Sequence, residues 1–146
     1  GRNYLPKDLF NYFQQGPLVL LQVPLEKRVD NIFHEYVLSS QKKHRELYGE
    51  SGLDLWHDGI EESLHRIKKR MDPVFFKETH RYLEQAYEDQ KANGDLSLHK
   101  KWVELLLTQY YDPMYSYQIK RKKDRIVLTA DQKEVETYLK AQKKKL

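Results

Sequence analysis

Two short apolar runs, at residues 17–23 and 125–129, constrain the fold of this chain more than any other feature. The first run, PLVLLQV, does not alternate with polar residues, which is typical of a strand buried on both faces in a parallel sheet. Because a long helical stretch separates the runs, we expect neighbouring parallel strands with a right-handed crossover. Two strands alone make a poor sheet, so we expect the rest of an α/β domain to precede Gly1.

The residues between the two runs carry apolar side chains at helical spacing. The pattern predicts helices at residues 25–48, 51–72, 73–93 and 97–107, with a further start or turn at Asp112-Pro113. Asp72-Pro73 suits a cap followed by a first-turn proline, and Asn93-Gly94 suits a helix end. One stripe on the second helix is expected to face the core: Trp56, Ile60, Leu64, Ile67 and Met71.

The predicted fold class is therefore mainly α within an α/β context, with two parallel strands flanking a helical insertion. We divide the chain into three segments. Residues 1–23 hold a helix and the first strand, residues 24–116 hold the helical insertion, and residues 117–146 hold the last strand, a terminal helix and a basic tail.

The net charge of +4 is concentrated in the last segment. Residues 1–116 have a balance of −2, with 16 Lys and Arg against 18 Asp and Glu, whereas residues 117–146 have a balance of +6. Such a patch attracts polyanions such as RNA, although lysine-rich termini also serve solubility alone. The candidate RNA-binding residues are Lys120, Arg121, Lys122, Lys123 and Arg125.

No catalytic motif is visible in the sequence. There is no cysteine, and the phosphate-loop, GxSxG and GxGxxG patterns are missing. The six histidines form no HExxH or comparable pair, and His57 and His65 are too far apart to ligate one metal, so we expect no catalytic and no metal-binding residue here. No apolar run approaches a membrane span, and the simplest compartment is the cytoplasm.

Three features are candidates for ligand contact. Arg28 follows the first strand within PLEKR (residues 24–28), where α/β proteins bind anions, although from the residues alone a surface arginine on the first turn of a helix is the more ordinary interpretation. The basic cluster at residues 66–70 suits either a phosphate or its helix dipole. The run YYDPMYSY (residues 110–117) places four tyrosines before KRKK, as in single-stranded RNA recognition or as in a packed aromatic corner.

These residues carry a resemblance to a known family. The run YYDPMYSYQ (residues 110–118) resembles the YYDPMYxYQ stretch near the C-terminus of tRNA 2-selenouridine synthases. Three further segments resemble that family in the same order: residues 1–6, PLEKR with Glu35-Tyr36, and HDGI (residues 57–60) with IKKR (residues 67–70). The resemblance covers essentially the whole chain.

The resemblance implies that the chain is the distal part of a P-loop kinase-like domain, behind an upstream P-loop and a rhodanese-like domain with an essential cysteine. It implies an enzyme that replaces sulfur by selenium in the wobble 2-thiouridine of tRNA through an S-geranylated intermediate. Selenophosphate and geranyl diphosphate would be its co-substrates, and no cofactor is expected in this chain. The chain alone would be inactive.

By the same resemblance, accessory residues are expected near the diphosphate or the tRNA: Arg28, His57, Lys69, Arg70, Tyr110, Tyr111, Asp112 and Tyr115. Two alternatives stay open from the residues alone. One is a helical interaction module without catalysis, and the other is the lid region of an unrelated P-loop kinase.

Overall fold

A computed structural model describes residues 5–143, which form two compact units. The helical unit comprises residues 24–116, and the strand unit comprises the described parts of residues 1–23 and 117–146. Residues 1–4 of the family-like segment at residues 1–6 lie outside the described part of the chain.

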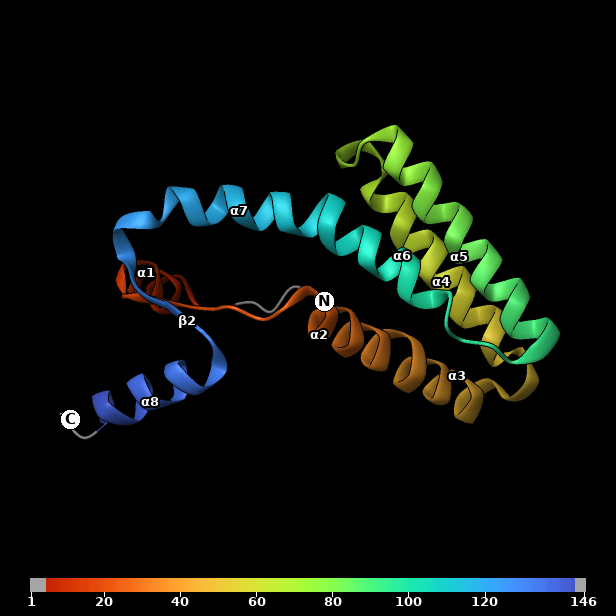
Figure 1. The fold of residues 1–146 in the computed structure, drawn as a ribbon, viewed down its shortest axis with the longest axis horizontal. Helices are drawn as coiled ribbons and strands as arrows, with labels where there is room; N and C mark the ends of the chain where they lie inside the picture. Colours follow the sequence, from red (N-terminus) through yellow and green to blue (C-terminus); the bar gives the residue numbers. More distant parts are fainter. Residues whose placement is uncertain (1–4, 144–146) are drawn as a thin grey trace. The chain divides into compact units, whose positions relative to one another are not determined.

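The strand unit is built around one pair of parallel strands (Figure 1). β1 (Leu18–Leu21) pairs with β2 (Ile126–Ala130), and Leu18 lies opposite Ile126. The expected parallel pairing of the two apolar runs is therefore confirmed. The expectation of burial on both faces is wrong within residues 5–143, because Leu18 to Leu20 are half-buried and Leu21 is exposed. Within this range each strand pairs only with the other, so each strand has one unpaired edge, and the faces of the pair are only partly buried.

Two helices complete the strand unit. α1 (Lys7–Gln15) precedes β1, and α8 (Gln132–Lys143) follows β2, where the Asp131 carboxylate accepts a hydrogen bond from the Glu134 backbone N–H at 3.0 Å. Arg125, which closes the short 3₁₀ segment η5 (Lys123–Arg125), donates to the backbone carbonyl oxygens of Phe13 and Gly16. This arginine therefore ties the end of α1 to the start of β2.

The helical unit begins with one long helical rod. α2 (Leu25–Ile32), the π-helical segment η1 (Phe33–Ser39) and α3 (Ser40–Tyr48) follow without a break. Gly49 then ends the rod with φ of 60°, a backbone conformation that suits glycine. The short 3₁₀ segment η2 (Gly49–Ser51) leads into the next helix.

The next two helices form an adjacent pair (Figure 1). α4 (Gly52–Ile67) ends in the 3₁₀ segment η3 (Lys68–Arg70), so the helix predicted to reach residue 72 stops earlier. α5 (Pro73–Asn93) has the expected boundaries, because the Asp72 carboxylate accepts from the Val74 N–H at 2.8 Å and Gly94 adopts the left-handed conformation.

A third helical rod contains the tyrosine-rich run. α6 (His99–Leu106), the π-helical segment η4 (Leu107–Tyr111) and α7 (Asp112–Arg121) are continuous. Asp112-Pro113 therefore begins a helix, as predicted, but it makes no turn. Proline has no N–H to donate and crowds the preceding turn, and a π-helical turn immediately before it accommodates both effects.

The core of the helical unit lies between these rods. Val37, Trp56, Leu83 and Val103 are almost completely buried, and the Trp56 indole donates to the Tyr36 carbonyl at 2.8 Å. From the predicted stripe, Trp56, Leu64 and Met71 are buried, whereas Ile60 and Ile67 are partly buried against the core.

A buried polar network crosses this core. The side chains of Gln41 and Gln90 exchange hydrogen bonds at 3.0 and 2.7 Å. The side-chain oxygen Oε1 of Gln90 also lies 2.8 Å from Nε2 of His99. The Trp102 indole donates to Nδ1 of His99 at 2.9 Å, which requires a neutral imidazole with its proton on Nε2. Burial, and secondarily the nearby charge of His57, lower the pKa of His99 to about 4.

The stability of the helical unit is accordingly expected to fall as the pH drops from about 6.5 to about 4. In that window the unfolded chain binds a proton at His99 and the folded chain does not, so the free energy of unfolding rises with pH by up to roughly 3 kcal/mol. Denaturation of the wild type and of His99→Gln, followed by tryptophan fluorescence, measures this because both tryptophans lie in this core. An unchanged slope in His99→Gln would contradict the assignment.

Candidate functional site

The helical unit contains a cavity of about 610 Å³ beside its core. Its walls come from α2, η1, α4, α5, α6, η4 and the start of α7, and most of its lining is apolar. The apolar lining includes Ile32, Ile60, Leu64, Ile67, Leu106 and Leu107. This size and composition are typical of sites for small organic ligands.

One side of the cavity carries an ion pair between segments far apart in the sequence. Arg28 on α2 donates two hydrogen bonds to Asp112 at the start of α7, at 2.5 and 3.0 Å between nitrogen and oxygen. These bonds raise the pKa of Arg28 above its ordinary value, against the opposing effect of partial burial. About a third of each side chain is exposed, so both charges can reach a ligand. Nε of Arg28 is buried without a hydrogen-bond partner in residues 5–143.

The tyrosines of the YYDPMYSY run have different surroundings. Tyr110 is buried in the core, whereas Tyr111 and Tyr115 line the cavity. The Tyr111 ring is nearly parallel to that of Tyr115, with 6.3 Å between ring centres, and meets the Tyr110 ring edge-on at 5.0 Å. Burial, followed by the neighbouring Tyr110 and Tyr36, raises the pKa of Tyr111. The Tyr111 phenol therefore stays neutral at physiological pH and can donate a hydrogen bond to an anion.

The structure brings four of the expected site residues together at this cavity: Arg28, Tyr111, Asp112 and Tyr115. Tyr110 supports them from the core. His57 instead lies between α4 and α5, where Nε2 is 2.8 Å from a carboxylate oxygen of Glu84. Lys69 and Arg70 are exposed in η3 and do not line the cavity, although the charge of Arg70 is close enough to oppose the pKa rise of Tyr111.

The expected RNA-binding residues lie in the strand unit. Lys120, Arg121 and Lys123 are exposed and Lys122 is half-exposed. The Arg121 guanidinium lies 5.9 Å from the centre of the Tyr117 ring. Arg125 differs from the other four, because its guanidinium donates to backbone carbonyls.

Sequence reasoning missed the apolar lining of the cavity. Ile60 and Ile67 belong to the stripe that we assigned to the core, and nothing in a helical period separates a packed position from one that faces a cavity. One sequence signal could have indicated the site: the PLEKR and YYDPMY motifs lie in helices that also carry unusually apolar faces.

These observations define the class of protein. It is mostly helical, has one parallel strand pair, and holds a largely apolar cavity bordered by an arginine–aspartate pair. The whole chain, residues 1–146, matches the family model described as "tRNA 2-selenouridine synthase AAA domain". The chain therefore belongs to this family.

Curated relatives agree with the family match. The chain is 40% identical over 140 residues to a tRNA 2-selenouridine synthase of Sulfurovum sp. (strain NBC37-1). The aligned residues cover 96% of this chain and 38% of the relative. It is 36% identical to the protein of that name from Pseudomonas putida (strain W619), over 97% of this chain and 39% of the relative. A protein of the same name from Shewanella loihica is 34% identical over 95% of this chain and 38% of its own length.

The chain thus spans less than two fifths of the length of these relatives. No solved structure matches it. Within residues 5–143, none of the helices combines the length and the apolar character that crossing a bilayer requires. Because the chain belongs to this family, the alternative of a lid region from an unrelated P-loop kinase is excluded.

Proposed function

We propose that this chain is the distal part of an enzyme that replaces sulfur by selenium in the wobble 2-thiouridine of tRNA, and that its cavity holds a geranyl diphosphate co-substrate. The observation that carries the proposal is the cavity itself, which combines a largely apolar lining with one arginine at its border. The name of the relatives, tRNA 2-selenouridine synthase, supports tRNA as the substrate and selenium as the incoming element.

The two parts of geranyl diphosphate match the two parts of the cavity. The ten-carbon chain gains free energy by leaving water, at about 25 cal/mol per Å² of buried apolar surface, and the isoleucine and leucine side chains offer that environment. The diphosphate needs cations and donors, which Arg28 and the Tyr111 and Tyr115 hydroxyls supply. Lys69 and Arg70 from η3 are proposed as further anion contacts.

Asp112 controls the availability of Arg28 in this proposal. The carboxylate occupies two guanidinium N–H groups in the ligand-free arrangement, while Nε has no partner in the described chain. An arriving diphosphate competes with Asp112 for the same cation. The pair therefore keeps a partly buried charge neutralised until an anion arrives.

The basic residues of the strand unit are proposed to contact tRNA. Lys120, Arg121, Lys122 and Lys123 supply exposed charge within the segment whose balance is +6, and Tyr117 beside Arg121 adds an aromatic face. Arg125 fits this role less well, because it holds α1 through the carbonyl oxygens of Phe13 and Gly16.

The remaining catalytic machinery is proposed to lie elsewhere in the parent protein. The AAA description of the family supports a P-loop context. By the family resemblance, a rhodanese-like domain would supply the nucleophilic cysteine. Leu9, Phe10, Tyr12 and Phe13 of α1 are 43 to 74% exposed, and the rest of the P-loop domain is the proposed cover for this face. We propose a cytoplasmic transferase with selenophosphate as the second co-substrate and no catalytic residue in this chain, in preference to a module without catalysis.

The proposed role of the cavity can be tested by filling it with a larger side chain. Ser63 is a small, half-buried lining residue on α4, and its neighbour Glu62 points to solvent outside the cavity. In the full-length protein, Ser63→Trp is expected to weaken geranyl diphosphate binding at least about tenfold while leaving inorganic diphosphate binding unchanged, because the indole occupies the space of the carbon chain. Glu62→Trp is the matched control. Equal affinities for geranyl diphosphate in the two variants would contradict the proposal.

A further inference from the structure

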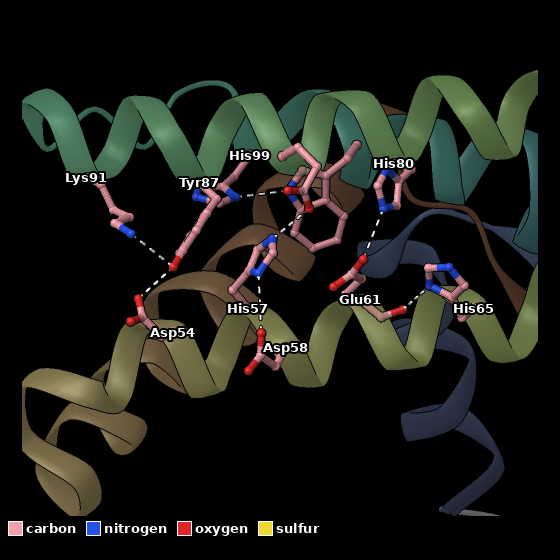
Figure 2. Close-up of polar contacts among 11 residues, drawn as sticks. Asp54, His57, Asp58, Glu61, His65, His80, Tyr87, Lys91 and His99 are labelled. Carbon is pink, nitrogen blue, oxygen red and sulfur yellow. Dashed lines mark hydrogen bonds and ion pairs between the residues drawn. The ribbon is translucent and has the colours of Figure 1, made fainter.

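The second polar cluster of the helical unit consists of two His–Glu pairs with the same spacing on adjacent helices. His57 and Glu61 are four residues apart on α4, and His80 and Glu84 are four residues apart on α5. Residues at this spacing lie on one face of a helix, so each helix presents one imidazole and one carboxylate. Figure 2 shows His57 and Glu61 on α4 facing α5, with His80 directed back toward Glu61.

The two pairs contact each other crosswise. Nε2 of His57 lies 2.8 Å from a carboxylate oxygen of Glu84, and Nε2 of His80 lies 3.2 Å from a carboxylate oxygen of Glu61. Ligand atoms of Glu61, His80 and Glu84 all lie within 4.8 Å of one another, and those of His57, Asp58 and Glu61 do likewise. The two triads share Glu61, but neither contains both His57 and His80, so the set that joins the two helices is Glu61, His80 and Glu84.

These separations are close to those around a bound zinc ion. At a metal–ligand distance near 2.0–2.1 Å, two ligands of a tetrahedral site lie about 3.3 Å apart. The His80–Glu61 separation of 3.2 Å already matches, and the ligand atoms of Glu84 lie within 4.8 Å of both. One imidazole nitrogen and two carboxylate oxygens, with a fourth position open to water, are a donor set that suits Zn²⁺ and related divalent transition ions.

The surroundings hold the ligands in place and leave an entrance. The His57 ring is buried and lies nearly parallel to the Tyr87 ring, with 4.0 Å between ring centres, and Tyr87 donates to Asp54 at 2.6 Å. The other His57 nitrogen, Nδ1, lies 3.8 Å from Asp58, so the ring lies between two carboxylates and positions Glu84. The side chains of Glu61, His80 and Glu84 remain 33 to 41% exposed, so an ion can reach them.

We propose that Glu61, His80 and Glu84 bind one divalent transition metal ion, with zinc as the best-matched species, that His57 positions Glu84, and that this ion clamps α4 to α5. Ile60, Ser63 and Leu64 of α4 line the cavity, so the clamp fixes one cavity wall without touching a ligand there. The proposal stands independently of what the cavity binds.

The test compares the metal content of the full-length protein with that of paired variants. After removal of metal by a chelator and equilibrium dialysis against Zn²⁺, the wild type is expected to hold one zinc ion per chain more than Glu61→Gln or His80→Gln. The controls are Glu62→Gln, whose carboxylate faces an exposed arginine, and His44→Gln, whose ring contacts the Ser40 carbonyl. Both should keep the wild-type content. Cobalt(II) should show the intense visible absorption of a tetrahedral site in the same proteins that retain the extra zinc.

A second measurement, of the melting temperature, distinguishes the loss of zinc binding from a failure of a variant to fold. Zinc should raise the melting temperature of the wild type and of Glu62→Gln, because an ion that binds only the folded chain stabilises it by mass action. Equal zinc content in folded Glu61→Gln, His80→Gln and the wild type would overturn the proposal. So would a wild-type melting temperature that does not respond to zinc. The cluster would then be a set of histidine–carboxylate hydrogen bonds.

Discussion

Replacing Arg28 by methionine is expected to weaken geranyl diphosphate binding to the full-length protein by roughly 10- to 100-fold. A hydrogen bond to a charged group contributes roughly 1.5–3 kcal/mol, and each 1.4 kcal/mol corresponds to a factor of ten in the dissociation constant. Methionine retains an apolar stem of similar length but removes the guanidinium. Titration calorimetry of the variant and the wild type gives the ratio directly.

The partner substitution is expected to act in the opposite direction. Asp112→Asn removes the carboxylate that competes for Arg28, so geranyl diphosphate should bind as tightly as in the wild type or more tightly. Lys27→Met, at an exposed position beside Arg28, is the control for loss of one positive charge. If Lys27→Met and Arg28→Met lose the same affinity, general electrostatic attraction explains the binding and the specific role of Arg28 is contradicted.

The second large effect concerns the stability of the helical unit. Gly52→Ala is expected to lower the free energy of unfolding by about 3 kcal/mol, the cost of overpacking a close contact. A Cβ atom at Gly52 would lie 2.6 Å from the backbone carbon and oxygen of His44. Because these are backbone atoms, α3 and the start of α4 would have to separate to relieve the clash. Urea denaturation followed by tryptophan fluorescence measures the loss.

Gly59→Ala on the same helix should have the opposite sign. A Cβ atom there meets nothing within 4 Å, and Gly59 does not have a positive φ. Alanine in a helix interior is favoured over glycine by roughly 1 kcal/mol, so this variant should be more stable than the wild type. Similar losses from both substitutions would show that α3 and α4 do not approach each other closely at Gly52.

The sequence was most informative where one residue determines local structure. Asp72, Pro73 and Gly94 fixed the limits of α5, because capping and left-handed glycine conformations depend on neighbouring residues alone. The parallel pairing of β1 and β2 followed from two apolar runs and a long helical connection. The π-helical segments η1 and η4 were not predicted, since their apolar residues give no distinct period at that length.

The candidate sites depended more on packing. Arg28, Tyr111, Asp112 and Tyr115 were suspected from their motifs, but their meeting at one cavity required the relative placement of α2 and α7. The His–Glu pairs were overlooked, because only His–His spacing was considered and the matching of Glu61 with His80 depends on how α4 packs against α5. The hydrogen bonds of Arg125 to Phe13 and Gly16 likewise arise only when distant segments come together.

Photolabelling most directly tests the central claim that the cavity holds an isoprenoid diphosphate. The full-length protein would be irradiated with a geranyl diphosphate analogue that carries a photoreactive group at the end of its carbon chain, and labelled peptides would be identified by mass spectrometry. Labels are expected on the cavity lining, at Ile60, Leu106 or Leu107, and excess geranyl diphosphate should suppress them. Labelling confined to residues outside 24–116, or labelling that geranyl diphosphate does not suppress, would contradict the account.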